Sequence, residues 1–375
     1  MNLAIVPRDP LLARDGKPFS SAIPGSRARS LPFATPQMVA GTVRTVYGFT
    51  RGLSFRQNEL QEVLQVAIKG PLPLIRNGDE WEFLFPAPSD GLPVRGSKGG
   101  SIRMVPLVPR KPSQTERVNR GEDWQPLFPM EDDLTPEKPP AAPSWWPSHM
   151  FRSWLLGEKV QWEEASAQFP APAEDTRVHV MIDPETRTAK EGMLFSTQSL
   201  EFVWKGKGAS LSQARELALW VGVVTPHAVS LEGVHPIGGE RRLALWQKGP
   251  EPWDMSDELL QMIRKSRGAR VILLTPSYFQ GGFAPKDQKL YGASIRAAAI
   301  GRPLVVSGWD MAKGQPKPSR RLVPAGSVYF VEFPEDWGFD RKERWAKDIW
   351  WQCIADGDEH RRNGEGLAVV GVWEP

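Results

Sequence analysis

The chain has 375 residues, a formal net charge of +3 and 40% hydrophobic residues, a size that suits two folded domains with insertions. Glycine (34) and proline (36) are more frequent than in an average protein, which predicts many loops. The single cysteine, Cys353, excludes an intrachain disulfide and argues against a cysteine-based zinc site. Pro7 and Arg8 come too early for a signal peptide, and the longest apolar runs are too short to span a membrane, so we expect a cytoplasmic protein.

The first predicted elements are a short strand at residues 3–6, a polar loop to about Pro32 and a helix that begins at Thr35. Thr35 is a favourable N-cap, and Pro36 suits the first turn of a helix. The residues expected to face the core are apolar and repeat at helical spacing: Met38, Val39, Val43, Val46 and Tyr47. A second stripe of the same helix consists of Gly41, Arg44, Gly48 and Arg51. Either its glycines let another backbone approach beside the arginines, or they pack against a sheet.

A second helix and a hairpin are predicted next. Ser54 with Gln57 resembles a capping box, and Gly70 suits the end of the helix that follows. Asn77 and Gly78 form a strong hairpin-turn signal between strands predicted at 72–76 and 80–85.

Residues 86–147 differ in character from the rest of the chain. They hold thirteen prolines, an acidic run at 131–133 and little periodicity, which predicts a long insertion that is partly extended or disordered. Trp145 and Trp146 end this stretch, and we expect them to pack on the core rather than to stack on bases.

Strands dominate the predicted elements after residue 148. Val178, Val180 and Ile182 alternate with other residues, which indicates a strand with one buried face. A helix capped by Ser256 is expected to run to Lys265. Further strands are predicted at 193–204, 270–275, 304–309, 328–333 and 367–373. Such a mixture favours α+β domains with antiparallel sheets, as in ferredoxin-like or RRM-like folds.

Basic residues are concentrated near the N-terminus. Between Arg8 and Arg56 there are eight cations and two anions, a local balance of +6. A local cationic face attracts phosphate even when the whole protein is nearly neutral. A nucleic-acid partner is therefore one interpretation, and a solvated surface is the other.

The sequence contains no recognisable catalytic or cofactor motif. The five histidines form no metal-ligand spacing, and there is neither a nucleophile elbow nor a Walker motif. We therefore expect no metal, no cofactor and no enzyme activity. One alternative stays open: a metal-independent ribonuclease with His235 as the base of the 2′-hydroxyl and with Glu240, Arg241 and Arg242 five to seven residues further on, where an arginine would bind the phosphate.

Seven segments have the character of specific motifs rather than general folding signals. They are PRDPLLARDGKPF (7–19), AGTVRT (40–45), ETRTAKEGMLF (185–195), PIGGERR (236–242), LLTPSYFQGGFAP (273–285), VVSGWDMAKGQPKPSRRLVPAGSVYF (305–330) and GEGLAVVG (364–371). In this order they resemble the Cmr subunit 3 family of type III-B CRISPR effector complexes, which belongs to the RAMP superfamily. The resemblance is interrupted mainly by residues 86–147.

The resemblance implies a fold and a role. The fold is two ferredoxin-like RAMP domains, residues 1–205 with the insertion at 86–147 and residues 206–375. The role is that of a non-catalytic subunit that holds the 5′ handle of the guide RNA (crRNA). Its implied neighbours are the large polymerase/cyclase subunit and the first backbone RAMP subunit, to which target cleavage and cyclic-oligoadenylate synthesis would belong. No membrane partner is implied.

The matched residues have the chemistry that such a handle needs, because a single RNA strand is held largely through its phosphates. Gly238 and Gly239 allow close backbone approach, and Arg241 and Arg242 supply charge. Adjacent residues of a strand point to opposite sides, so one arginine or Glu240 is expected to fix the loop. The predicted RNA contacts are Arg14, Lys17, Arg27, Arg29, Arg44, Gly238, Gly239, Arg241, Arg242, Lys317, Arg320 and Arg321.

Two residues depart from the family pattern. Ala13 stands where an aromatic residue is often found, so base stacking is not expected there. Glu365 stands in the C-terminal glycine-rich loop, where a carboxylate beside phosphate is unfavourable, so Gly364 and Gly366 are interpreted as packing residues.

A further alternative to RNA binding is a purely architectural subunit whose basic clusters contact acidic protein surfaces.

Overall fold

The chain folds into two compact units in a computed structural model that describes all residues except 15–26, 97–99, 113–123, 132–133, 135–137, 165–168, 239, 241, 311–313 and 375. Unit 1 consists of Met1–Trp81, Pro170–Pro250 and Val305–Arg321, and unit 2 of Glu82–Phe169, Glu251–Leu304 and Leu322–Pro375. The units therefore interleave along the chain, whereas the sequence predicts two contiguous domains that meet at residues 205 and 206.

Unit 1 is built on an antiparallel sheet with the strand order β14-β15-β1-β13-β3, and β12 pairs with the outer part of β13. Its elements are β1 (Asn2–Pro7), β2 (Arg27–Ala28), α1 (Pro36–Thr50), α2 (Gln57–Gln65), β3 (Ala67–Asn77), β10 (Ala173–Ile182), β11 (Ala189–Glu201), β12 (Val203–Trp204), the 3-10 helix η1 (Leu211–Gln213), β13 (Arg215–Val224), β14 (Gly233–Ile237), β15 (Arg242–Lys248), β20 (Trp309–Asp310) and β21 (Gln315–Pro316). The N-terminal strand β1 lies in the middle of this sheet because it pairs with both β13 and β15.

Helix α1 begins where its sequence predicts. The hydroxyl of Thr35 accepts a hydrogen bond from the backbone N–H of Met38 at 3.3 Å, and Pro36 occupies the first turn. The predicted apolar face is buried, apart from the half-exposed Met38. The glycine stripe does not pack against a sheet, because Gly41 is exposed with open space around it and Gly48 lies under the ring of Phe55.

Helix α2 differs from its prediction at both ends. It starts at Gln57 and stops at Gln65, and Gly70 lies inside β3, where the carbonyl oxygen of Trp220 leaves no room for a side chain. Ser54 does not cap the helix; its N–H and hydroxyl both donate to the carboxylate of Glu59, a bond that lowers the pKa of this carboxyl group. The capping-box pattern was therefore wrong in register, because Glu59 and not Gln57 meets Ser54.

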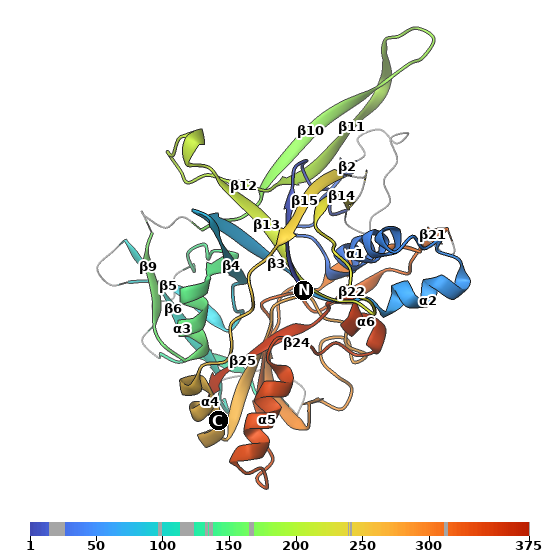
Figure 1. The fold of residues 1–375 in the computed structure, drawn as a ribbon. Coiled ribbons are helices and arrows are strands. Elements are labelled where there is room, and N and C mark those ends of the chain that lie inside the picture. Colours follow the sequence, from blue (N-terminus) through green and yellow to red (C-terminus); the bar gives the residue numbers. More distant parts are fainter. Residues whose placement is uncertain are drawn as a thin grey trace. The chain divides into compact units, whose positions relative to one another are not determined.

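Strands β10 and β11 form a long antiparallel hairpin that extends away from the sheet of unit 1, in light green in Figure 1. The strand at 178–182 is confirmed, but its predicted buried face is wrong. Val178, Val180 and Ile182 are 66%, 42% and 54% exposed. Alternation of apolar residues shows that they share a face, but it does not show that another layer covers that face.

Unit 2 contains a sheet with the order β17-β18-β23-β16-β25-β24 and a smaller sheet of β5, β6 and β7 with β9 on β6. Its elements are β5 (Gly91–Arg95), β6 (Ser101–Pro109), β7 (Leu127–Pro129), β8 (Trp145–Pro147), α3 (Ser148–Leu155), β9 (Val160–Glu163), α4 (Asp257–Lys265), β16 (Gly268–Leu273), β17 (Lys289–Leu290), β18 (Ala293–Ala299), β23 (Val328–Glu332), α5 (Phe339–Ile349), β24 (Gln352–Cys353), α6 (Asp358–Arg362) and β25 (Leu367–Trp373). Three further strands, β4 (Glu80–Pro86), β19 (Leu304–Val306) and β22 (Arg320–Leu322), include the points where one unit passes into the other.

The proline-rich stretch is an integral part of unit 2 where the structure describes it. It supplies β5, β6, β7 and β8, so the extended conformation predicted for part of it is confirmed. Trp146 is fully buried and meets Trp154 edge-to-face with ring centroids 5.7 Å apart, which confirms that it packs on the core.

A buried charged cluster ties four segments of unit 2 together. The guanidinium of Arg270 donates to Oδ2 of Asp90 at 2.7 Å, to the carbonyl of Trp154 at 2.6 Å and to that of Val372 at 2.8 Å. The indole N–H of Trp154 donates to the other carboxylate oxygen of Asp90 at 2.9 Å. Since Arg270 and Asp90 are only 5% and 0% exposed, each charge depends on the other for its solvation.

The fold class is confirmed as α+β with mostly antiparallel sheets. Helices α3, α5 and α6 and strand β18 were not predicted, because the residues before Phe339 and Asp358 give no side-chain cap and β18 is largely alanine. Among the described residues, no helix combines the length and the apolar character needed to cross a bilayer.

We predict that Asp90→Ala lowers the free energy of unfolding by about 3–5 kcal/mol, because it leaves the charge of Arg270 buried without its partner. The measurement is urea-induced unfolding of the full chain. Glu131→Gln is the matched control, since it breaks the exposed ion pair of Glu131 with Arg103 and should cost less than about 1 kcal/mol. Equal effects of the two substitutions would contradict the prediction.

Candidate nucleic-acid interface

The predicted contact residues that the structure describes all belong to unit 1. They are Arg14, Arg27, Arg29, Arg44, Gly238, Arg242, Lys317, Arg320 and Arg321. Lys17, Gly239 and Arg241 lie outside the described residues. These positions are more than 300 residues apart along the chain at their extremes, so the fold of unit 1 decides which of them meet.

The turn between β14 and β15 rests on the start of α1. Gly238 adopts a left-handed backbone with φ of 66°, and Glu240 in the same turn has φ of 59°. A side chain on Gly238 would come within 3.0 Å of Leu11, 3.4 Å of the carbonyl of Leu12 and 3.5 Å of the sulfur of Met38. Glycine is therefore required here both for the backbone conformation and for the close approach.

Hydrogen bonds from the N-terminal strand fix this turn from its other side. The carboxylate of Asp9 accepts the backbone N–H of Leu243 at 2.9 Å, and the N–H of Arg8 donates to the carbonyl of Leu243 at the same distance. Within the turn, Arg242 donates to the carboxylate of Glu240 at 2.7 Å. Glu240 and Arg242 are thus paired with each other within the turn.

A second loop, the hairpin of β20 and β21, stands against the first turn of α1. Its base is closed by the N–H of Lys317, which donates to the carbonyl of Gly308 at 2.7 Å, and by the hydroxyl of Ser307, which donates to the carbonyl of Lys317 at 3.0 Å. A side chain on Gly308 would meet the amide nitrogen of Gln37 at 2.6 Å and the stem of Lys317 at 3.7 Å. Lys317 and Gln37 therefore lie beside the same glycine.

The predicted N-terminal contacts Arg14, Arg27 and Arg29 lie on neighbouring segments of unit 1. Arg14 forms an antiparallel bridge with Ser30, and the N–H of Leu31 donates to the carbonyl of Ala13 at 2.6 Å, so Arg14 and Arg29 lie near each other. Arg27 pairs in parallel with Ser196, midway along the β10–β11 hairpin. The side chains of these three arginines are exposed.

Arg44 has a different environment from the other predicted contacts. Its Nε donates to the carbonyl of Val66, just beyond the end of α2, at 3.1 Å, and its side chain is half-buried. This contact joins α1 to the segment that follows α2. We therefore treat Arg44 as part of the support for α1. The other predicted cations of unit 1 are called the cationic edge.

The arrangement brings three basic segments to the first turn of α1. Leu11 and Leu12 lie three and two residues before Arg14, Gly238 lies four residues before Arg242, and Lys317 lies beside Gln37. The two carboxylates of the turn region have partners there, since Asp9 accepts the N–H of Leu243 and Glu240 accepts from Arg242. Such an edge is suited to several successive phosphate groups of one strand.

The glycine-rich loop at 364–366 belongs to unit 2 and serves packing, as interpreted from the sequence. A side chain on Gly366 would meet the hydroxyl of Ser277 at 2.7 Å and the N–H of Ala355 at 2.8 Å. Glu365 is 2% exposed, and its carboxylate bonds to Nδ1 of His360 at 2.7 Å. The carboxylate is therefore satisfied inside unit 2 and does not face a ligand.

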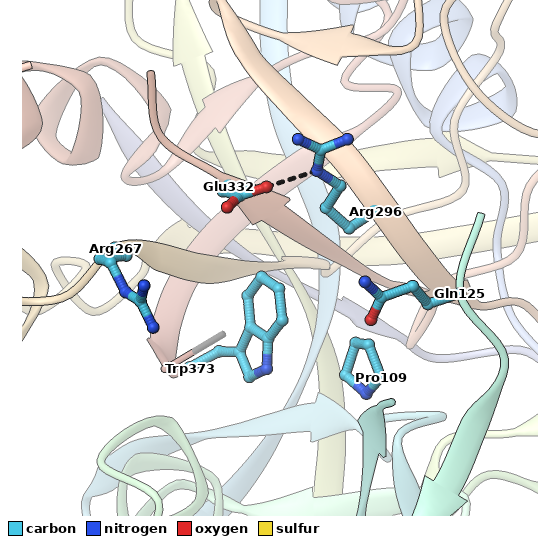
Figure 2. A pocket seen from close by; sticks show the side chains of 6 residues that line it. All are labelled: Pro109, Gln125, Arg267, Arg296, Glu332 and Trp373. Carbon is cyan, nitrogen blue, oxygen red and sulfur yellow. Dashed lines mark hydrogen bonds and ion pairs between the residues drawn. The ribbon is translucent and has the colours of Figure 1, made fainter. Parts of the chain in front are cut away.

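Unit 2 contains a small cavity of about 170 Å³ (Figure 2). It is lined by Pro109, Gln125, Arg267, Arg296, Glu332 and Trp373. Figure 2 shows Arg296 turned toward Glu332, with which it forms an ion pair at 2.5 Å. The charge of Arg296 is thus balanced within the cavity wall, and none of the predicted contacts lies there.

Sequence reasoning missed Gln37, which the structure places among the predicted cations. Its position directly after the Thr35-Pro36 start signal marked it as a first-turn residue, but nothing in the sequence indicates that Gly308 lies beside it. This proximity depends on a contact between segments about 270 residues apart, which local patterns do not contain.

The chain belongs to a family of CRISPR-associated proteins. The profile of the family described as CRISPR-associated protein (Cas_Cmr3) matches residues 3–373, nearly the whole chain. The recognition of the Cmr subunit 3 family from the seven segments is confirmed by this match, and the chain is therefore a subunit of a type III-B CRISPR effector complex. No curated protein matches the sequence.

Solved structures with a similar fold are distant. One is a chain of the type III-B Cmr-beta complex bound to cognate target RNA and AMPPnP, with 17% identity over 88% of this chain and 86% of that chain and a TM-score of 0.46. Another is a chain of the Csm3-Csm4 subcomplex of the type III-A CRISPR-Cas interference complex, with 9% identity over 100% of both chains and a TM-score of 0.36.

We predict that Gly238→Ala lowers the free energy of unfolding by about 1–2 kcal/mol, because alanine is strained at positive φ and its methyl group would press on Leu11. Gly41→Ala is the matched control and should raise stability by about 0.5–1 kcal/mol, since Gly41 is an exposed helical residue with free space around it. Thermal unfolding of both variants tests this, and the same sign for both would refute it.

Proposed function

We propose that this chain is a non-catalytic subunit that binds the repeat-derived 5′ handle of the crRNA and holds it in one fixed path. The observation that carries the proposal is the convergence of three cation-bearing segments on the first turn of α1. Each segment is held by backbone hydrogen bonds or by a glycine contact, so the cations stand on rigid supports. Rigid supports suit a ligand that must be held in one register.

The chemistry of the edge favours a single RNA strand over an acidic protein surface. Guanidinium groups bind phosphate oxygens in a bidentate way, and a lysine adds a point charge. Arg14, Arg242 and Lys317 come from three separate segments of unit 1 that meet near the first turn of α1, which suits a ligand that carries several phosphates. An acidic protein partner would be an alternative for any one of the clusters, but it would not require three of them.

Two finer features of the proposal come from the family resemblance. Each of the two domains would be ferredoxin-like, as in the RAMP superfamily. The handle would lie next to the large polymerase/cyclase subunit and the first backbone RAMP subunit, and these neighbours would carry out the chemistry. The mainly antiparallel sheets of both units agree with such domains.

The environment of His235 supports a non-catalytic role over a repeat-processing endoribonuclease. Its ring meets Trp246 edge-to-face with centroids 5.3 Å apart, and its Nε2 is buried near Gly233. A general base for a 2′-hydroxyl needs an accessible ring nitrogen. The ring instead lies on the inner face of β14, where it packs with its neighbours.

We expect the double variant Arg241→Ala/Arg242→Ala to weaken guide loading by about 10-fold or more without unfolding the chain, because it removes both cations of the β14–β15 turn, whichever of them meets phosphate. The measurement is the amount of crRNA recovered per purified complex, with circular dichroism as the test of folding. Lys347→Ala on α5 of unit 2 is the control, since it removes an exposed cation outside the interface. Unchanged recovery with a correctly discriminated handle would refute the proposed function.

We also expect RNA binding by the full chain to be strongly salt-dependent, with a slope that changes when Lys317 is removed. Each phosphate neutralised on a single strand contributes about −0.7 to the slope of log K against log salt concentration. Lys317→Ala should therefore reduce the magnitude of the slope by about 0.7, and Lys347→Ala should leave it unchanged. Titration of a fluorescent repeat-derived RNA over a salt series measures both slopes.

A further inference from the structure

The Gln37 side chain is an uncharged group that lies beside Lys317. Gln37 is the second residue of α1 and is half-buried. Its amide nitrogen lies 2.6 Å from the point where a side chain on Gly308 would begin, and the stem of Lys317 lies on the same side of that glycine. Gly308 thus provides the space in which the amide sits.

Two other glutamines of unit 1, Gln198 and Gln213, have hydrogen-bond partners among the described residues. Gln198 accepts the N–H of Ser30 and donates to Glu174, and Gln213 accepts the N–H of Ser210. Within the part of the chain that the structure describes, no residue forms a hydrogen bond with the amide of Gln37. Its two N–H donors and its carbonyl acceptor therefore remain available to a ligand.

An amide offers a type of recognition that its cationic neighbours lack. Lysine and arginine only donate, which suits phosphate oxygens, whereas a base edge presents donors and acceptors side by side. Glutamine can donate and accept at once and so can pair with a base edge in a bidentate way. Unpaired bases of single-stranded RNA are recognised through such edges.

We propose that Gln37 reads the edge of one base of the bound guide RNA, while Lys317 and Arg242 hold the phosphates of the same strand. This inference rests on the proposed function, because it requires the strand to follow the cationic edge. It assigns base discrimination to the first turn of α1 and to a single side chain. The role of Gly308 is to leave room for the amide in its reading position.

The test uses the assembled effector complex and a pool of guides whose repeat-derived 5′ segment is randomised. Guides recovered from purified complexes are sequenced, and the enrichment of each base is compared at every position. With the native chain we expect about a 10-fold to 100-fold preference at one position, the range of one bidentate contact. Gln37→Ala should remove this preference at that position alone and leave total guide recovery within about 3-fold.

Two further variants sharpen the test. Gly308→Ala keeps the glutamine but places a methyl group where its amide sits, so it should weaken the same preference; the backbone at Gly308 accepts alanine because its φ is not in the left-handed region. Gln61→Ala, which removes an exposed glutamine of α2, should leave the preference unchanged.

The outcomes separate this inference from the proposed function. If Gln37→Ala keeps the base preference, or lowers recovery of all guides equally, Gln37 reads no base and the inference is overturned. The same holds if the native complex shows no preference at any position while it still carries guides through Arg241 and Arg242. If the arginine double variant loads guides normally, the proposed function itself fails, whatever Gln37 does.

Discussion

The absence of a side chain at Gly238 is the constraint on which the interface depends. The turn between β14 and β15 rests on Leu11, Leu12 and Met38, and its backbone at Gly238 has a φ of 66° that favours glycine. This contact holds the N-terminal segment, the turn and the start of α1 together. A larger residue would separate the cations that precede and follow it, even though it would change no charge.

The central position of β1 explains why cations from distant parts of the sequence share one edge. β1 pairs with β13 on one side and β15 on the other, so the chain that leaves β1 passes directly beside the β14–β15 turn. Asp9 and Arg8 then bond to Leu243. The sheet therefore sets the distance between Arg14 and Arg242, and the sequence separation of these residues does not matter.

Local signals predicted the parts of unit 1 that depend on neighbouring residues. The cap at Thr35, the strand β1 and the hairpin turn at Gly78 are confirmed because each is determined within a few positions. The buried face at 178–182, the end of α2 and the neighbour of Gln37 depend on distant segments, and these were wrong or missed. The family motifs indicated the charged loops but not their meeting point at α1.

The three-segment construction of unit 1 has a consequence for synthesis of the protein. The hairpin that carries Lys317 comes from the third segment, Val305–Arg321, whereas α1 comes from the first. On the ribosome, the residues of α1 are made long before this hairpin, which is complete only after more than four-fifths of the polypeptide has been made. Assembly of the cationic edge is thus coupled to near-completion of translation.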